Sequence, residues 1–291
     1  MAMKIPTKKL KNGFEMPVFG LGTWQMGGRF ERNPENDDKA DIQAIKNAIE
    51  AGITHIDTAE AYAAGWAEKL IGKAIKGYDR KKLIIVSKVK WENLNYDSII
   101  KAANSSLERL ETNYLDLYLI HGPNPQIPIQ ETIKAMDYLK EKGLVKNIGV
   151  CNFSIARFKE AQFYTKNKLI ANQLHHNLIY REAQRKGLIE FCQTNDVMFI
   201  AWRPVQKGIL TTADNSLMNT MVKKYGKTPS QIAINWVISK PNIVTLSKMT
   251  KPEHLKENLG ALGWNLEEED VEKLDKEFPN QKNISDAVPL I

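Results

Sequence analysis

Cysteine is scarce in this sequence, and long apolar stretches are missing from it. The two cysteines, Cys151 and Cys192, form no CxxC pair and are too few for a disulfide framework, so we expect both to be small buried hydrophobic residues. No apolar run approaches the roughly 18 residues that a transmembrane helix needs, and the first residues contain no apolar signal-peptide core. The sequence therefore predicts a cytoplasmic protein without a membrane partner.

A concentrated basic surface and a histidine metal cluster are also missing. Lysine and arginine exceed aspartate and glutamate by 41 to 34, a formal net charge of +7, but the lysines are scattered and form no arginine-rich stripe. We therefore expect a solvated basic surface and no nucleic acid partner. His121, His175 and His176 follow neither HxH nor HExxH spacing, so a metal-dependent hydrolase is a minor alternative and no metal site is predicted.

Apolar runs recur along most of the chain at nearly regular intervals. The residues near which these runs end are Trp24, Asp57, Lys88, His121, Asn152, Gln173, Trp202 and Ser247. Six of the seven intervals span 21 to 33 residues, the length of one strand, one helix and two loops. The runs are continuously apolar, as in residues 83–86 and 197–201, which is typical of parallel strands buried on both faces. Eight such units predict an α/β fold, a closed (β/α)8 TIM barrel, in a single domain over residues 1–291.

Amphipathic segments between the apolar runs predict the helices of these units. Two apolar stripes end shortly before Gly52 and Gly143, and a glycine in that place commonly stops a helix. Residues 228–231, Thr-Pro-Ser-Gln, form a capping box with proline at the first helical position. Ahead of the barrel, the pair Asn12-Gly13 favours a two-residue turn, so we expect a small N-terminal β-hairpin.

Four side chains of complementary chemistry follow successive strand ends. Asp57, Lys88 and His121 end the second, third and fourth runs, and Tyr62 lies in the loop after Asp57. Enzymes of the barrel fold carry their active sites at this end of the strands. A tyrosine with an ordinary pKa of about 10 is a poor acid near neutrality, and we expect a lysine ammonium beside it to lower that pKa. With the aspartate holding the lysine and the histidine bonding the substrate oxygen, the four groups can polarise and protonate a carbonyl.

Several segments around these residues resemble the aldo-keto reductase family. They are residues 20–24, 55–59 with Tyr62, 87–88, 119–121, 149–154 and 172–173, in family order. The resemblance runs from the hairpin to about Lys273 and implies a barrel enzyme that reduces aldehydes or ketones to alcohols with NADPH. It implies that the hydride comes from nicotinamide C4 and the proton from Tyr62. By the same match, Asp57 and Lys88 tune the tyrosine and His121 orients the carbonyl.

The resemblance also implies where the dinucleotide lies. Asn152 and Gln173 match residues that hydrogen-bond the nicotinamide carboxamide, and Trp202 matches an aromatic residue, commonly tyrosine, that stacks on the nicotinamide ring. Arg203 and Lys207 fall in the loop over the pyrophosphate. The full set of implied cofactor-binding residues is Thr23, Trp24, Asp57, Cys151, Asn152, Gln173, Trp202, Arg203, Val205, Lys207, Gly208, Lys248, Met249, Thr250, His254, Glu257 and Asn258. No GxGxxG fingerprint accompanies them.

The choice of cofactor depends on the segment after the last strand. Lys248 matches the family's lysine for the 2′-phosphate, and a helix start with nearby lysines suits a phosphate on physical grounds. His254, however, stands where many members carry an arginine that holds both the phosphate and the adenine. We therefore expect NADPH, with NADH left open.

The substrate is expected to lie against Trp24, Tyr62, Trp91 and His121. Segment 27–38 is long and polar for a loop of this fold and is expected to fold over the entrance. The tail after the last helical stretch, residues 279–291, is short and is expected to form little of the substrate wall, which leaves an open pocket. The predicted partner is a small-molecule carbonyl compound, and the predicted state is a monomer.

One alternative function also follows from a resemblance. Residues 57–65 are similar to the corresponding stretch of potassium-channel β-subunits, which share the barrel. A dinucleotide-binding regulatory subunit that senses redox state therefore stays open beside the reductase, because such subunits keep the same four polar residues.

Overall fold

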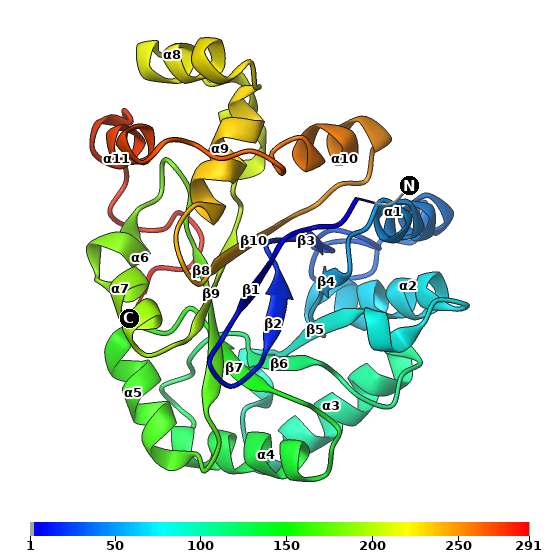
Figure 1. Ribbon diagram of the computed structural model, residues 1–291. Helices are drawn as coiled ribbons and strands as arrows, with labels where there is room; N and C mark the ends of the chain where they lie inside the picture. Colours follow the sequence, from blue (N-terminus) through cyan, green and yellow to red (C-terminus); the bar gives the residue numbers. More distant parts are fainter. Residues whose placement is uncertain (1–2, 291) are drawn as a thin grey trace.

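A closed barrel of eight parallel strands forms the centre of the protein (Figure 1). The structure is a computed structural model and describes residues 3–290. The strands follow one another around the barrel from β3 to β10, and β10 pairs with β3 to close it. Strands β3 to β10 span, in order, Phe19–Gly22, His55–Asp57, Ile84–Val89, Leu117–Ile120, Ile148–Cys151, Leu169–His175, Met198–Trp202 and Ile243–Ser247. The predicted TIM barrel is confirmed.

Helices surround the barrel as an outer ring (Figure 1). They are α1 (Asp38–Glu50), α2 (Trp66–Ile75), α3 (Tyr96–Leu110), α4 (Ile129–Glu141), α5 (Ile155–Tyr164), α6 (Glu182–Arg185), α7 (Leu188–Thr194), α8 (Ser216–Tyr225), α9 (Pro229–Ile238), α10 (Pro252–Leu259) and α11 (Glu268–Glu277). Gly52 and Gly143, which follow α1 and α4, have φ of 106° and 72°, as expected of glycines that end helices. Thr228 caps α9 through the predicted box with Gln231.

The N-terminal hairpin has a longer loop than the sequence suggested. Strands β1 (Thr7–Lys9) and β2 (Glu15–Pro17) pair antiparallel, which confirms the hairpin. Leu10 N donates to the Phe14 carbonyl at 2.8 Å, so three residues rather than two connect the last paired positions. Gly13 takes a φ of 90° and its N–H donates to the Leu10 carbonyl at 3.0 Å. Glycine therefore supplies the left-handed residue at the end of a three-residue loop, and the prediction of a two-residue turn is wrong.

The hairpin packs into the bottom of the barrel. Leu10 and Met16 join a buried cluster made otherwise by side chains from the barrel strands, such as Leu117, Met198 and Val244. A second, larger cluster lies between the strands and the helices. In Figure 1 the hairpin crosses in front of the barrel, so this view looks at the end that carries the amino termini of the strands. The site predicted from the sequence lies at the opposite end.

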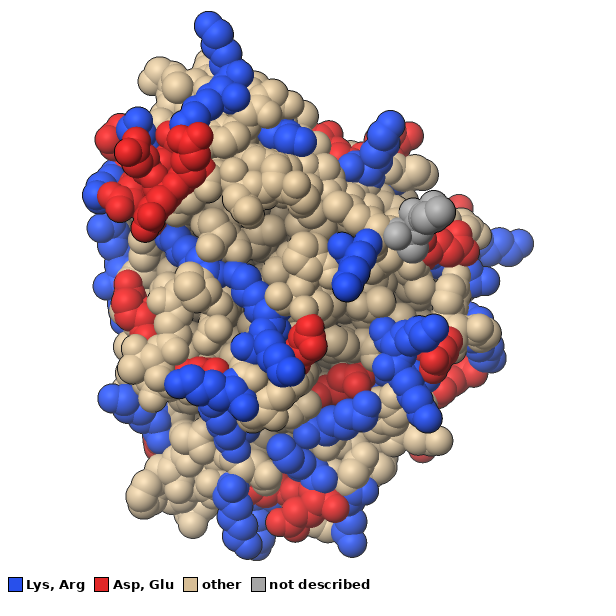
Figure 2. Space-filling view, viewed as in Figure 1, with Lys and Arg blue, Asp and Glu red and all other residues tan. Residues whose placement is uncertain are grey.

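The surface seen from the hairpin side carries dispersed charge. In Figure 2, lysines and arginines are spread among uncharged residues, and an acidic patch lies at the upper left, where Figure 1 places α11. That helix begins with Glu268, Glu269 and Asp270. Within residues 3–290, no helix has the length and apolar character needed to span a bilayer.

Candidate active site

Two oppositely charged side chains are buried at the carboxyl ends of neighbouring strands. Asp57 ends β4 and Lys88 lies near the end of β5, so parallel pairing of these strands brings the two residues together. Lys88 Nζ donates to Asp57 Oδ1 at 2.6 Å and to the Thr58 carbonyl at 2.7 Å. The lysine side chain is 0% exposed and the aspartate 2%. Because an isolated buried charge is costly, pairing the two opposite charges offsets part of the cost of burying them.

Tyr62 reaches this ion pair from a turn with an uncommon backbone conformation. Its hydroxyl lies 3.4 Å from Lys88 Nζ, which donates to it. The next two residues, Ala63 and Ala64, have φ of 51° and 53°, in the left-handed region that L-residues avoid. Their N–H groups donate to the carbonyls of residues 29 and 30. The polar loop between β3 and α1 therefore holds the turn that aims Tyr62, consistent with its expected place over the entrance.

Replacing Ala64 with glycine is expected to raise the free energy of unfolding by about 0.5–1 kcal/mol. Left-handed backbone costs an L-residue about 1–2 kcal/mol, and glycine avoids this cost. Glycine also loses more backbone entropy on folding, which cancels only part of the stabilisation. Ala61, which has a right-handed backbone, is the matched control, and Ala61→Gly is expected to destabilise by a similar amount. Urea denaturation of both variants measures the effect, and equal signs for the two would contradict it.

Burial and charge act in opposite directions on the tyrosine and the lysine. Burial by itself lowers the pKa of Lys88, but Asp57 and Tyr62 raise it more, so the net pKa lies above the usual value and the lysine stays charged. Burial raises the pKa of Tyr62 to about 12, and Lys88 lowers it by less. The expected effect of the lysine is present, but the prediction of a lowered tyrosine pKa is wrong because burial is the larger effect.

His121 faces the tyrosine from the end of β6. The centroids of the His121 and Tyr62 rings are 5.7 Å apart. Burial lowers the pKa of His121 to about 3, and the Lys88 charge acts in the same direction, so the imidazole is neutral at physiological pH. Its Nδ1 is buried and has no hydrogen-bond partner among the described residues. A neutral imidazole can donate one hydrogen bond to a substrate oxygen without adding a charge to the pocket.

Gln173 contacts the ion pair as well as lying where the nicotinamide was expected. Its Nε2 donates to Asp57 Oδ2 at 2.7 Å, and its Oε1 accepts from Cys151 Sγ at 3.5 Å. Asp57 therefore has a donor on each oxygen, Lys88 on one and Gln173 on the other. The glutamine fixes the carboxylate, a role that the sequence did not reveal.

Asn152 carries an unpaired acceptor that fits a carboxamide. Its Nδ2 donates to the His121 carbonyl at 3.1 Å, whereas its Oδ1 is buried and has no partner among residues 3–290. Its φ of 59° is one that asparagine tolerates better than most residues. A buried acceptor without a donor is unfavourable, and a carboxamide nitrogen is the kind of donor it lacks. The residues at the ends of β7 and β8 therefore fit the nicotinamide end of a dinucleotide.

Trp202 belongs to a stack of three rings that the sequence analysis missed. Its indole lies parallel to the His175 imidazole, with centroids 4.1 Å apart and an interplanar angle of 7°. The Tyr180 ring also stacks on the His175 imidazole, with centroids 4.6 Å apart. His175 Nε2 bonds Gln206 Oε1 at 2.9 Å and its Nδ1 bonds Ser285 Oγ at 2.8 Å. Burial lowers the pKa of His175 to about 4, so a neutral ring supports the indole.

The loop after β9 combines uncommon backbone conformations with two cations. Arg203, Gln206 and Lys207 have φ of 59°, 45° and 54°, and Gly208 follows with 93°. Such clusters of positive φ are concentrated at ligand-binding segments. Asp286 lies 3.3 Å from the arginine Nη1 and 4.0 Å from the lysine Nζ. The C-terminal tail was expected only as a reduced substrate wall, but it reaches the proposed pyrophosphate loop instead.

The segment implied for the adenine end lies at the start of α10. Lys248, Thr250 and His254 are exposed, whereas Met249 and Asn258 are buried. The helix begins at Pro252 and has no side-chain cap at its N-terminus. Glu257 is half-buried and accepts a hydrogen bond from the Thr228 hydroxyl at 2.8 Å. The exposed residues and the uncapped helix start can meet a phosphate, whereas Met249 and Asn258 pack within the fold.

Thr23, another implied cofactor residue, is bonded to the backbone of Asp57. It is fully buried, and its hydroxyl donates to the Asp57 carbonyl at 2.9 Å. Its backbone N–H donates to the same carbonyl at 3.0 Å. Thr23 therefore joins the ends of β3 and β4 and positions Asp57 through the backbone.

Aromatic rings line the side of the site where the substrate was expected. The Trp24 ring lies 5.0 Å from Tyr62 and 5.0 Å from Phe30, and the Trp91 ring lies 6.0 Å from His121. Phe30 is 58% exposed and was not predicted. Phe30 was not singled out because the loop around it is polar, yet its ring extends the aromatic surface beyond Trp24.

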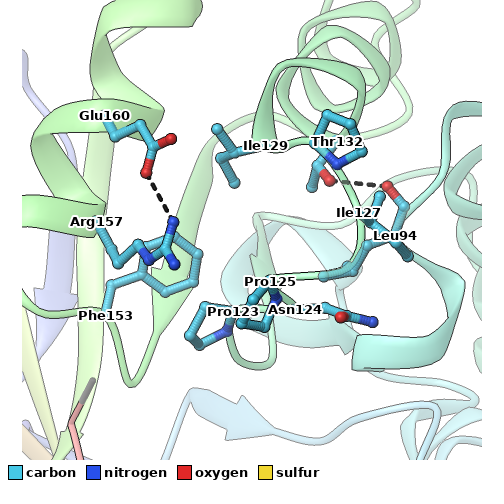
Figure 3. Close-up of a pocket in the computed structure, with 11 residues that line it drawn as sticks. Leu94, Pro123, Asn124, Pro125, Ile127, Ile129, Thr132, Phe153, Arg157 and Glu160 are labelled. Carbon is cyan, nitrogen blue, oxygen red and sulfur yellow. Dashed lines mark hydrogen bonds and ion pairs between the residues drawn. The ribbon is translucent and has the colours of Figure 1, made fainter.

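A separate small pocket lies beneath the loop that follows His121. Figure 3 shows its lining from the β6–α4 loop, including Pro123 and Asn124, and from the start of α5, where Arg157 pairs with Glu160 at 3.0 Å. Asn124 Nδ2 donates to the Trp91 carbonyl at 2.8 Å and so ties this loop to the substrate side. The pocket is not lined by any of the proposed catalytic residues, Asp57, Tyr62, Lys88 and His121. Within residues 3–290, no group of three His, Cys, Asp or Glu side chains could hold a metal ion.

Comparison with known proteins agrees with the geometry. The Aldo/keto reductase family model matches residues 18–277. Methylglyoxal reductase YeaE of Escherichia coli (strain K12) is 33% identical over 271 residues, covering 92% of this chain and 93% of that protein. Glyoxal reductase of Bacillus subtilis (strain 168) is also 33% identical, covering 92% of this chain and 91% of that protein.

Solved structures give the same result. The thermostable aldo-keto reductase Tm1743, solved with the inhibitor epalrestat, has a TM-score of 0.90 and 40% identity, covering 93% of this chain and 99% of that one. An aldo-keto reductase from Klebsiella pneumoniae, solved with NADPH, has a TM-score of 0.84 and 31% identity, covering 97% of this chain and 98% of that one. These matches are reductases and do not support the alternative of a channel regulatory subunit. The chain belongs to the aldo/keto reductase family and is an NADP(H)-dependent oxidoreductase.

Proposed function

We propose that Tyr62 donates the proton and His121 orients the carbonyl in the reduction that this enzyme catalyses. The observation that carries the proposal is the chain of contacts from the Tyr62 hydroxyl to Lys88 Nζ at 3.4 Å and on to Asp57 at 2.6 Å. When bound, NADPH supplies the hydride from nicotinamide C4. Because Lys88 donates to the phenol oxygen, the O–H of Tyr62 stays available for the substrate oxygen.

Proton donation from Tyr62 is favourable although its pKa is high. Hydride addition to a carbonyl leaves an alkoxide, which is a much stronger base than a phenolate. A phenol with a pKa of about 12 therefore still protonates it, and the Lys88 charge stabilises the phenolate that forms. The neutral His121 adds a hydrogen bond to the same oxygen and fixes its direction.

The dinucleotide is proposed to extend from Asn152 to the start of α10. The unpaired Oδ1 of Asn152 supports the carboxamide end, and the cations Arg203 and Lys207 support the pyrophosphate. The exposed Lys248 and the uncapped helix start support a 2′-phosphate, which favours NADPH over NADH.

Small aldehydes, including 2-oxoaldehydes, are the proposed substrates. Two relatives are named for the reduction of methylglyoxal and glyoxal, and the aromatic rings of Trp24 and Trp91 offer an apolar surface beside Tyr62. Initial rates with methylglyoxal, glyoxal and benzaldehyde, each with NADPH and with NADH, test the proposal. We expect turnover with NADPH and a lower kcat/KM with NADH. A chain that binds NADPH but oxidises it with none of these carbonyls would not be the proposed reductase.

The rate of reduction is expected to show no inflection between about pH 6 and 9. Reduction needs protonated Tyr62, which persists below its pKa of about 12, and neutral His121, which persists above its pKa of about 3. Oxidation of the alcohol needs the phenolate and is expected to rise with pH over the same range. Profiles of kcat/KM against pH in both directions measure this, and an acidic limb near neutrality in reduction would contradict it.

The enzyme is further proposed to act as a single-domain monomer in the cytoplasm, without a nucleic acid partner. Both cysteines are buried and free, which suits a reducing compartment, and the basic residues on the face in Figure 2 are dispersed. One cooperative unfolding transition and a sedimentation mass near 33.1 kDa are the expected results. A dimer mass would contradict the monomer.

A further inference from the structure

The C-terminal tail is fixed on both sides of Asp286. Before it, Lys282 exchanges backbone hydrogen bonds with the segment that precedes α6, at 2.7 and 2.8 Å. The buried carboxylate of Glu182 accepts from the N–H groups of Ser285 and Leu290 at 2.8 and 3.0 Å. Glu182 is 2% exposed, so this anchor lies inside the fold. The tail therefore presents Asp286 at a defined place beside the end of β9.

Asp286 contacts the loop that the proposed function assigns to the pyrophosphate. Its Oδ1 lies 3.3 Å from Arg203 Nη1, and its Oδ2 lies 3.2 Å from Gln206 Nε2 and 4.0 Å from Lys207 Nζ. The His175 imidazole is 3.8 Å away and neutral, so it does not balance the carboxylate. The side chain of Asp286 is 32% exposed, which leaves its charge only partly screened.

Asp286 reduces the positive charge that this loop presents to an anion. Arg203 and Lys207 together carry two positive charges, and Asp286 removes one of them from the local balance. A diphosphate that approaches these cations would meet a carboxylate already bound to them. The carboxylate and the diphosphate repel each other and compete for the same cations, so each weakens the binding of the other.

We propose that Asp286 sets the affinity for the dinucleotide by competing with its diphosphate for Arg203 and Lys207. This inference rests on the proposed function, which places the diphosphate at that loop. The tail carboxylate acts as an internal counter-ion that must yield part of its contacts when the dinucleotide binds, and it favours dissociation afterwards. Asp286 is therefore a residue that sets cofactor exchange and takes no part in the proton or hydride transfer.

The test compares Asp286→Asn with the wild-type chain and with Asp214→Asn. Asp214 is an exposed aspartate farther along the same connection, where it accepts from Asn219, so its replacement changes net charge equally. Titration of intrinsic fluorescence gives the Kd of NADPH and of NADH, and stopped-flow displacement gives the dissociation rates. We expect Asp286→Asn to tighten both cofactors by about fivefold through slower dissociation, and Asp214→Asn to change them by less than about twofold.

The electrostatic origin gives two further readouts. NADH and NADPH carry the same diphosphate, so the gain should be equal for both and should shrink at high salt. A gain for NADPH alone would place Asp286 at the 2′-phosphate and overturn the proposal, as would an unchanged or weaker affinity. Asp286→Ser is a second charge-free variant, so a folding defect in one replacement does not decide the result. If the wild-type chain itself bound neither cofactor, the proposed function would fail first.

Discussion

Replacing Tyr62 with phenylalanine is expected to lower kcat for carbonyl reduction by about 10³-fold and to leave the Kd of NADPH within about twofold. The change removes one hydroxyl, the only group in the proposal that gives a proton to the substrate oxygen. The ring stays in place between Trp24 and His121, so the shape of the pocket is kept. Steady-state rates and fluorescence titration of NADPH measure the two effects separately.

The matched control for this variant is Tyr164→Phe. Tyr164 ends α5 and is 41% exposed, so the same hydroxyl is removed far from Lys88. Its kcat and Kd should equal the wild-type values. Retention of more than about a tenth of the turnover in Tyr62→Phe would remove the tyrosine from its proposed role.

Replacing Lys88 with methionine is expected to damage both stability and turnover. The variant leaves the Asp57 carboxylate buried without its cation, and breaking one partner of such a pair costs about 3–5 kcal/mol. It also removes the charge that stabilises the Tyr62 phenolate, so kcat should fall by at least about 10²-fold. Urea denaturation and steady-state rates measure the two losses.

The double variant Asp57→Asn/Lys88→Met separates the two effects of this change. Asparagine can still accept from Gln173 Nε2, and no uncompensated charge remains in the core. We expect most of the lost stability to return and turnover to stay at the level of the single variant. Recovery of turnover along with stability would mean that Lys88 serves the fold alone.

The barrel could be predicted because its signal is repeated along the whole chain. Eight apolar runs at regular intervals leave few alternatives, and the strands that the structure places at β3 to β10 coincide with them. The ion pair of Asp57 and Lys88 followed for the same reason, since successive strand ends must meet at one edge. The hairpin loop was mispredicted by one residue because an Asn-Gly pair fits both the two-residue and the three-residue loop.

The remaining parts of the site could not be predicted because they depend on burial and on distant segments. The pKa of Tyr62 is set by the balance between burial and the Lys88 charge, and burial is not visible in a motif. His175 and Asp286 lie far apart in the chain and meet only when the tail folds back over the strand ends. Neither residue has neighbours in the sequence whose spacing would indicate a role.

The packing of Leu10 and Met16 into the barrel has a consequence for how Tyr62 is reprotonated in the proposed reaction. Apolar side chains of the hairpin and the strands fill this end of the barrel, so the proposed reacting groups meet solvent at the opposite end, where the strands finish. In the proposed reaction, the proton that Tyr62 gives up is then replaced from the same side of the barrel on which the alcohol leaves. Reprotonation of Tyr62 and release of the alcohol would therefore occur on the same side of the barrel.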